Sequence, residues 1–116
     1  METSKMRIIQ ELVPGKQITL AHVIANPDPS IYEQFQTKSI SANFSIGVMT
    51  ITPPETSIII ADISIKSADV QIVSVNASSG SLIIAGTVAN VEAAVRAVLE
   101  YVEEKLGFEV CVMTKT

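Results

Sequence analysis

The chain has 116 residues, a net charge of −4 at pH 7 and a sequence pI near 4.8. Its eight basic residues are scattered, which argues against a nucleic-acid binder, because such a protein needs clustered cations to displace counterions from phosphates. The length predicts one domain with a single core. The hydrophobic share of 47%, with no tryptophan, exceeds what a lone domain of this size needs to bury, so we expect subunit interfaces.

The sequence also predicts a cytosolic protein with no membrane partner. The longest apolar run, residues 57–65, is interrupted by Asp62 and is too short to cross a bilayer. The N-terminus lacks the apolar stretch of a signal peptide. A single cysteine, Cys111, cannot form an internal disulfide, which fits a reducing compartment.

The N-terminal part of the chain is expected to contain two strands and a short helix. Residues 6–13 are strand-like and end at the turn dipeptide Pro14-Gly15, with no hairpin partner nearby, so their neighbour could lie on another subunit. Residues 17–25 form a second strand, and both of its faces are expected to be largely buried. One of these faces is predicted to carry Ile18, Leu20, His22 and Ile24. Asp28 and Pro29 then supply the cap and first position of a short helix.

Residues 44–75 are predicted to form a strand, a helix and a strand. The first strand alternates up to Ile51, and Thr52 with Glu55 then forms a capping box around Pro53. The predicted apolar stripe of the helix contains Ile58, Ala61, Ile65 and Ala68, widened by Ile59 and Ile63. The alternative is a buried strand over residues 57–65, because isoleucine is β-branched, but the cap signal favours the helix.

The remaining chain is expected to contain a hairpin, a long helix and a final strand. Strands at 70–75 and 81–85 are joined by the loop at 76–80, and a helix then runs from residue 88 to about 106. Its predicted core stripe is Val88, Val91, Val95, Val98, Val102 and Leu106, with a Glu92–Arg96 ion pair on the wet side and Gly107 at its end. With a last strand at 108–113, residues 44–113 have the βαββαβ order of a ferredoxin-like α+β domain. That order predicts an antiparallel sheet with both helices on one face.

Little in the sequence indicates catalysis. His22 and Cys111 are the only residues of their kinds, and each lies in a predicted strand among apolar neighbours, so a structural role is favoured over a metal ligand or nucleophile. The Ser78-Ser79-Gly80 segment could cradle an anion with backbone N–H groups, although turn chemistry explains it equally well. We therefore predict no enzyme, no metal and no cofactor.

Several blocks closely resemble circularly permuted bacterial microcompartment shell proteins of the propanediol- and ethanolamine-utilisation type. The blocks are QELVPGKQITLAHVIANP at 10–27, IGVMTITP at 46–53, KSADV at 66–70, VANVE at 88–92 and CVMTKT at 111–116. The resemblance implies a βαββαβ domain whose last strand and short helix have moved to the front, here residues 17–35, with an extra N-terminal strand at 6–13. It also implies hexamers that tile into a shell in the cytoplasm. The partners would then be other copies, other shell proteins and encapsulated enzymes.

The resemblance assigns three groups of site residues. The loop between the central strands would line a six-fold pore that gates small metabolites: Asn76, Ala77, Ser78, Ser79 and Gly80. The lateral edge between hexamers would contain Lys66 with its i,i+4 partner Asp62, and Asn26, where unpermuted relatives often carry arginine. A six-stranded parallel barrel capping the pore would be built from Arg7, Ile8, Ile9, Gln10, Glu11 and Leu12.

One departure from the family pattern, one alternative assembly and one alternative function complete the expectations. Permuted relatives often carry an acidic-basic-aromatic run in the pore loop, whereas this loop is small and uncharged. A slightly different rotation between subunits would also give an open helix in place of a closed ring. From another functional class, an oligomeric ferredoxin-like domain that binds a small ligand or has a regulatory role would show a tight ligand pocket.

Overall fold

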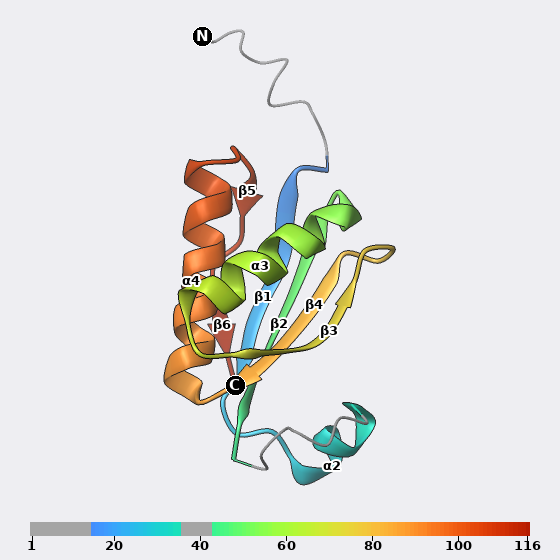
Figure 1. Ribbon diagram of the computed structural model, residues 1–116, viewed down its shortest axis with the longest axis vertical. Helices are drawn as coiled ribbons and strands as arrows, with labels where there is room; N and C mark the ends of the chain where they lie inside the picture. The colour runs from blue at the N-terminus through green and yellow to red at the C-terminus, as the bar shows by residue number, and fades with distance from the viewer. Residues whose placement is uncertain (1–14, 36–42) are drawn as a thin grey trace, which may run out of the picture.

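The computed structural model describes residues 15–35 and 43–116 (Figure 1). These residues form an α+β structure around one six-stranded sheet, which confirms the predicted fold class. The strands are β1 (Gln17–Ile24), β2 (Ser45–Thr52), β3 (Gln71–Asn76), β4 (Ser81–Gly86), β5 (Glu109–Val110) and β6 (Thr114–Lys115). The helices are α2 (Pro29–Tyr32), α3 (Ser57–Ser67) and α4 (Val88–Glu104), with 3-10 turns η1 (Glu33–Phe35) and η2 (Pro54–Thr56).

The strand order is β3-β4-β2-β1-β5, and β6 also pairs with β1. The pairs β1–β2, β2–β4 and β3–β4 are antiparallel, whereas β5 and β6 run parallel to β1. The continuous last strand predicted at 108–113 is therefore wrong, because residues 111–113 lie in no strand and the flanking strands have two residues each. The place beside β2 is already taken by β1, so the C-terminal residues reach only the outer edge of β1.

Helices α3 and α4 pack on the same face of the sheet, as predicted (Figure 1). The buried core between helices and sheet is almost entirely aliphatic. Its members from the sheet are Ile18, Ala21, Val23, Met49, Ile51, Leu82 and Ile84. Gly47 lets α4 approach closely, since a Cβ at that position would lie 2.9 Å from Cγ1 of Val91.

Strand β1 contains an irregularity that changes which residues face the core. Ile18 pairs with Ile51 and Leu20 pairs with Thr50, so Thr19 is an extra residue on the β1 side. The prediction that Ile18 and Leu20 share a face is wrong for this reason. Leu20 is 41% exposed, so the expectation that both faces of this strand are buried is also wrong.

Helix α3 forms as predicted, but it begins later than the capping box suggested. Thr52 is the last residue of β2, and its hydroxyl donates to the carbonyl of Gln17 at 3.4 Å. Pro53 is extended, with ψ of 149°, because a residue that precedes a proline is disfavoured in the helical region. The 3-10 turn η2 follows, and α3 starts at Ser57 without a side-chain cap.

The buried face of α3 also differs from the predicted stripe. The buried residues are Ser57, Ile60, Ala61 and Ser64, so of the predicted stripe Ala61 is buried and Ala68 is partly buried. Ile58 and Ile65 are instead 58% and 50% exposed. The helix carries isoleucines on every side, so the periodicity of its apolar residues fits more than one face.

Helix α4 follows its predicted pattern closely. Val91, Val95, Val98 and Val102 are fully buried, while Val88 and Leu106 at the two ends are exposed. Thr87 caps the helix by accepting from the N–H of Asn90, and Gly107 follows the helix with a φ of +73°. The short helix α2 likewise begins as predicted, with the Asp28 carboxylate accepting from the N–H of Ser30 at 3.0 Å.

Candidate functional site

The hairpin between β3 and β4 is held in shape by its own first residue. The Asn76 side-chain oxygen accepts from the N–H groups of Ser78 (2.8 Å) and Ser79 (3.0 Å), and the Asn76 carbonyl accepts from the N–H of Gly80 (2.8 Å). Three of the N–H groups that an anion would need are therefore already used. This favours the turn-chemistry interpretation of the Ser-Ser-Gly segment over an anion cradle.

The base of the hairpin lies directly against the end of β2 and the start of α3. Gly80 has a φ of +80°, and a Cβ at this position would lie 2.1 Å from the carbonyl oxygen of Ile51. The carbonyl of Gly80 accepts from the N–H of Ile51 at 2.9 Å, and the Ser57 hydroxyl donates to the Asn76 carbonyl at 3.3 Å. Only a glycine fits this position without displacing backbone.

The tip of the hairpin is exposed and uncharged. Residues 76–79 are all exposed, whereas Gly80 is buried. The Ser79 and Ser81 hydroxyls are 3.0 Å apart and hydrogen-bonded, so the polar groups presented to solvent are neutral hydroxyls and one amide.

The predicted lateral-edge residues lie on two separate elements. Lys66 Nζ is 2.8 Å from Asp62 Oδ2 near the end of α3, and both side chains are more than half exposed. The hydrogen bond that the Lys66 ammonium donates to the Asp62 carboxylate, followed by the negative charge of Asp62, raises the pKa of Lys66. Asn26 is exposed in the bend between β1 and α2. This bend lies at the end of the sheet away from the hairpin (Figure 1).

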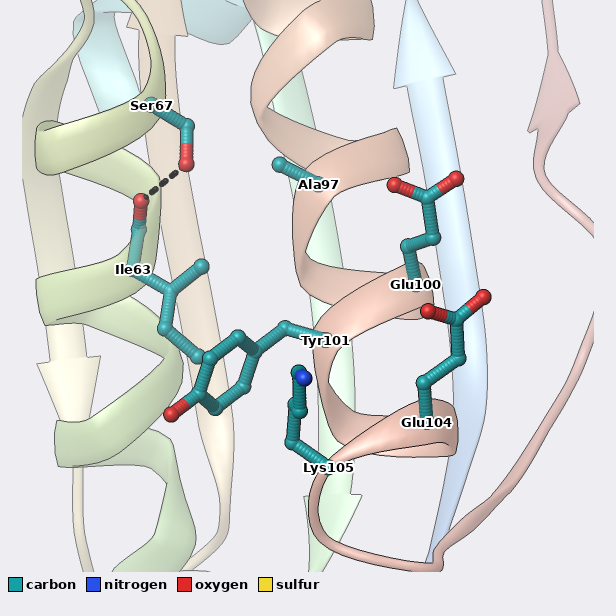
Figure 2. A pocket seen from close by; sticks show the side chains of 7 residues that line it. All are labelled: Ile63, Ser67, Ala97, Glu100, Tyr101, Glu104 and Lys105. Carbon is teal, nitrogen blue, oxygen red and sulfur yellow. Dashed lines mark hydrogen bonds between the residues drawn. The ribbon is translucent and has the colours of Figure 1, made fainter.

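A shallow groove of about 280 Å³ separates α3 from α4, and it was not foreseen because it arises from how the two helices pack (Figure 2). Tyr101 extends from α4 toward Ile63 on α3, and Glu100 and Glu104 lie along α4 (Figure 2). A second hollow next to it is lined by the Asp62–Lys66 pair together with Tyr101. Most of the lining side chains are exposed, which does not favour the alternative of a tight ligand pocket.

His22 and Cys111 have structural surroundings. The Nδ1 atom of His22 is 2.6 Å from the Thr114 hydroxyl and its Nε2 atom is 2.9 Å from the Thr116 hydroxyl, so the ring links β1 to the C-terminal residues. Cys111 is partly buried against the core. Across residues 15–35 and 43–116, no three His, Cys, Asp or Glu side chains gather in a way that could hold a metal ion.

Two further findings concern the described part of the chain alone. None of the helices seen there has the length and apolar character needed to cross a membrane. The predicted barrel residues, Arg7 to Leu12, lie outside the described residues.

Comparison with known proteins identifies the class. The BMC domain family matches residues 45–114. The chain is 46% identical over 110 residues to the bacterial microcompartment shell protein CutR of Streptococcus intermedius, covering 95% of this chain and 92% of CutR. It is 43% identical to the shell protein EutS of Salmonella typhimurium, covering 97% and 99% of the two chains. The chain therefore belongs to the bacterial microcompartment shell proteins, and it is a structural subunit rather than an enzyme.

Solved structures agree with this membership. A CutR flat hexamer is 44% identical, with a TM-score of 0.83 and coverage of 95% of this chain and 99% of that chain. A CutR screw with a 41.9 Å pitch is 42% identical, with a TM-score of 0.82 and coverage of 89% and 100%. Subunits with this fold thus occur in both a flat and a helical arrangement.

Proposed function

We propose that this chain assembles with itself as a closed ring of six copies and that these rings tile into a microcompartment shell. The observation that carries the proposal is the similarity to the CutR flat hexamer over nearly the full length of both chains. An excess of apolar residues and three exposed isoleucines on α3 support self-association.

The sheet order supports a circular permutation. In a ferredoxin-like βαββαβ sheet the fourth strand lies antiparallel beside the first. That position, next to β2, is held here by β1, which comes first among the described strands. The family match begins at residue 45, after β1 and α2, and this too fits an element pair moved to the front.

The hairpin at residues 76–80 would line the central pore of the ring. Because its tip has no charged side chain and three of its N–H groups are used internally, it would pass small polar metabolites with little preference for their charge. Residues 7–12 would form the barrel that caps this pore, as the family resemblance implies. Encapsulated enzymes would lie on the luminal side of the shell.

Contacts between rings would use Lys66, Asp62 and Asn26. The Lys66 side chain is largely exposed, so its ammonium would contact a neighbouring ring and keep its ion pair with Asp62. Other shell proteins with compatible edges would be further partners in the sheet.

An open helical arrangement is the second candidate, because a CutR screw resembles this chain almost as closely as the flat hexamer does. A heterologous contact closes into a ring only when its rotation is right, and otherwise it continues as a helix. Both arrangements would use the same kind of head-to-tail contact.

Native mass spectrometry of the full chain at low micromolar concentration tests the proposal. A dominant hexamer is expected. A ladder of sizes without a preferred one would favour the screw, whereas a monomer or dimer at every concentration would overturn both arrangements. Electron microscopy of concentrated protein would then distinguish flat sheets from tubes or filaments.

A further inference from the structure

The groove between α3 and α4 has an apolar base that is open to solvent. Tyr101 extends from α4 toward Ile63 on α3, and Ala97 also lines the groove (Figure 2). Ile59 precedes Ile63 by about one helical turn, so it extends this apolar surface along α3. Ile59 is 48% exposed and Tyr101 is 45% exposed. An exposed apolar surface shared by two helices indicates an interaction site.

The walls of this α3–α4 groove determine which kind of segment fits it. Both walls are helices, whose backbone N–H and C=O groups are used within the helices, so the groove offers side chains alone. A segment lying there must satisfy its own backbone, which a helix does and a single extended strand does not. The groove is shallow, with a volume of about 280 Å³. It therefore suits a few large side chains from one face of a helix rather than an enclosed metabolite.

The rim of the groove on α4 is negatively charged. Glu100 and Glu104 lie four residues apart on the same side of α4 (Figure 2). Neither carboxylate takes part in an ion pair within residues 15–35 and 43–116. The last turn of α4 also contains no basic residue. Like charges at this spacing near the C-terminal end of a helix destabilise it, so a cation from a partner would relieve the repulsion.

The cations near the groove do not cancel this rim. Lys66 Nζ lies 2.8 Å from Asp62 Oδ2, so that pair is neutral as a whole. Lys105 lies beside Tyr101 (Figure 2), which leaves two carboxylates and one ammonium as the unpaired charges of the lining. The net charge of −4 on the chain acts in the same direction. Charge complementarity therefore favours a basic partner over an acidic one.

We propose that the α3–α4 groove binds a basic amphipathic helix of another protein. Apolar residues of that helix, spaced at i, i+4 and i+7, would lie on Ile59, Ile63 and Tyr101. Lysine or arginine side chains along one flank would pair with Glu100 and Glu104. The groove lies within one subunit, so the proposal goes beyond the shell function and does not depend on how the copies assemble.

Fluorescence anisotropy with a synthetic peptide and the full chain tests the proposal. The probe is a labelled helical peptide of about 18 residues made of leucine, alanine and lysine, and its control has glutamate in place of every lysine. We expect the basic peptide to bind with a Kd on the order of 10 μM and the acidic peptide to bind at least about thirtyfold more weakly.

Two double variants with the same change in net charge locate the binding. Glu100→Lys/Glu104→Lys reverses the rim of the groove and should weaken binding of the basic peptide by about thirtyfold or more. Glu103→Lys/Glu109→Lys reverses two exposed carboxylates that do not line the groove, so binding should weaken by less than about threefold.

The apolar part of the site has its own variant. Tyr101→Ala removes the aromatic ring from the base of the groove and should weaken binding by about tenfold. Circular dichroism of this variant should match that of the wild type, because Tyr101 is exposed and outside the core.

The outcomes separate this proposal from the shell function. Binding that is lost in the groove variants and kept in the control supports the proposal, whether or not the wild type forms a ring in native mass spectrometry. The proposal is overturned if the wild type does not bind the basic peptide, if both peptides bind equally, or if both charge variants lose binding equally. It is also overturned if Glu100→Lys/Glu104→Lys abolishes association between rings without peptide, since the occupant would then be a second copy.

Discussion

Helices α3 and α4 pack on the same face of one sheet, yet their outer surfaces differ. Helix α4 buries four of its five valines and turns charged residues outward, including Arg96 and Glu100. Helix α3 buries a narrow face built partly from serine and exposes three isoleucines. The comparison teaches that α4 has a surface suited to water, whereas α3 has a second apolar surface suited to another protein.

The largest expected effect comes from placing one charge on each helix. Val98→Asp puts a carboxylate at a fully buried position of α4 and should destabilise the fold by about 4 kcal/mol or more. Ile65→Asp makes the same kind of change on α3 at a half-exposed position, so the subunit should remain folded while its assembly weakens. Circular dichroism with urea unfolding measures the first effect and native mass spectrometry the second. A folded Val98→Asp subunit would contradict the division between the two helices.

A smaller effect should reveal how tightly α3 sits on the sheet. Ser64 is fully buried and its hydroxyl donates to the Ile60 carbonyl at 2.8 Å within the same helix. Ser64→Leu should lower the free energy of unfolding by about 2 kcal/mol, because the added volume has no space beneath the helix. Ser64→Ala is the control and should change it by less than about 0.5 kcal/mol, since alanine fits and favours the helix. Urea unfolding of both variants in the Ile65→Asp background would separate fold stability from assembly.

The ion pairs of Glu92 on α4 should make the stability of the fold modestly dependent on pH. The carboxylate of Glu92 accepts from Lys115 Nζ at 2.7 Å and from Arg96 at 3.3 Å, and these cations, Lys115 first, hold its pKa below the ordinary value of 4.5. A depressed pKa stabilises the fold above pH 4.5, and that stabilisation is lost as the pH falls through the lowered pKa. As the pH falls from 7 into the acid range, the Glu92→Gln variant should therefore lose less stability than the wild type, and thermal unfolding measures this loss. Equal losses would show that this carboxylate does not link the C-terminal residues to α4.

The smallest effect on the fold is expected for Lys66→Ala. Its ion pair with Asp62 is exposed and screened by solvent, so the free energy of unfolding should hardly change. Sheets of rings seen by electron microscopy should nevertheless become scarce, while native mass spectrometry still shows the ring. Lys105→Ala, at the end of α4, is the matched control. Dissociation of the Lys66→Ala ring itself would place Lys66 within the ring rather than between rings.

The parts of the fold that could be predicted are those with one dominant local signal. The valine stripe of α4, Gly107 after it and the Asp28-Pro29 start of α2 each depend on neighbouring residues, and the structure contains all three. Alternation likewise predicted strands where the structure has β1 and β2, and the βαββαβ order predicted the antiparallel pairing around β2.

The errors share a different cause, because each depended on distant parts of the chain. The extra residue at Thr19 is visible only once β1 is paired with β2. The capping box predicted at Thr52 does not form, because Pro53 is held extended by Pro54 and Thr52 is paired with β1. The spacing of apolar residues could not identify the buried face of α3, because apolar residues lie on both its core face and its exposed flank. The groove beside Tyr101 arises from the packing of two helices, and no local sequence pattern indicates it.

The self-contained hydrogen bonding of the β3–β4 hairpin has a consequence for assembly. Because Asn76 fixes the loop before any neighbour arrives, ring formation would not have to order it, and little conformational entropy would be lost there. A constriction made from such loops would be a fixed aperture rather than a moving gate. Its width would then be set by the side chains at positions 77 and 78, so permeability could be tuned one substitution at a time without disturbing the subunit.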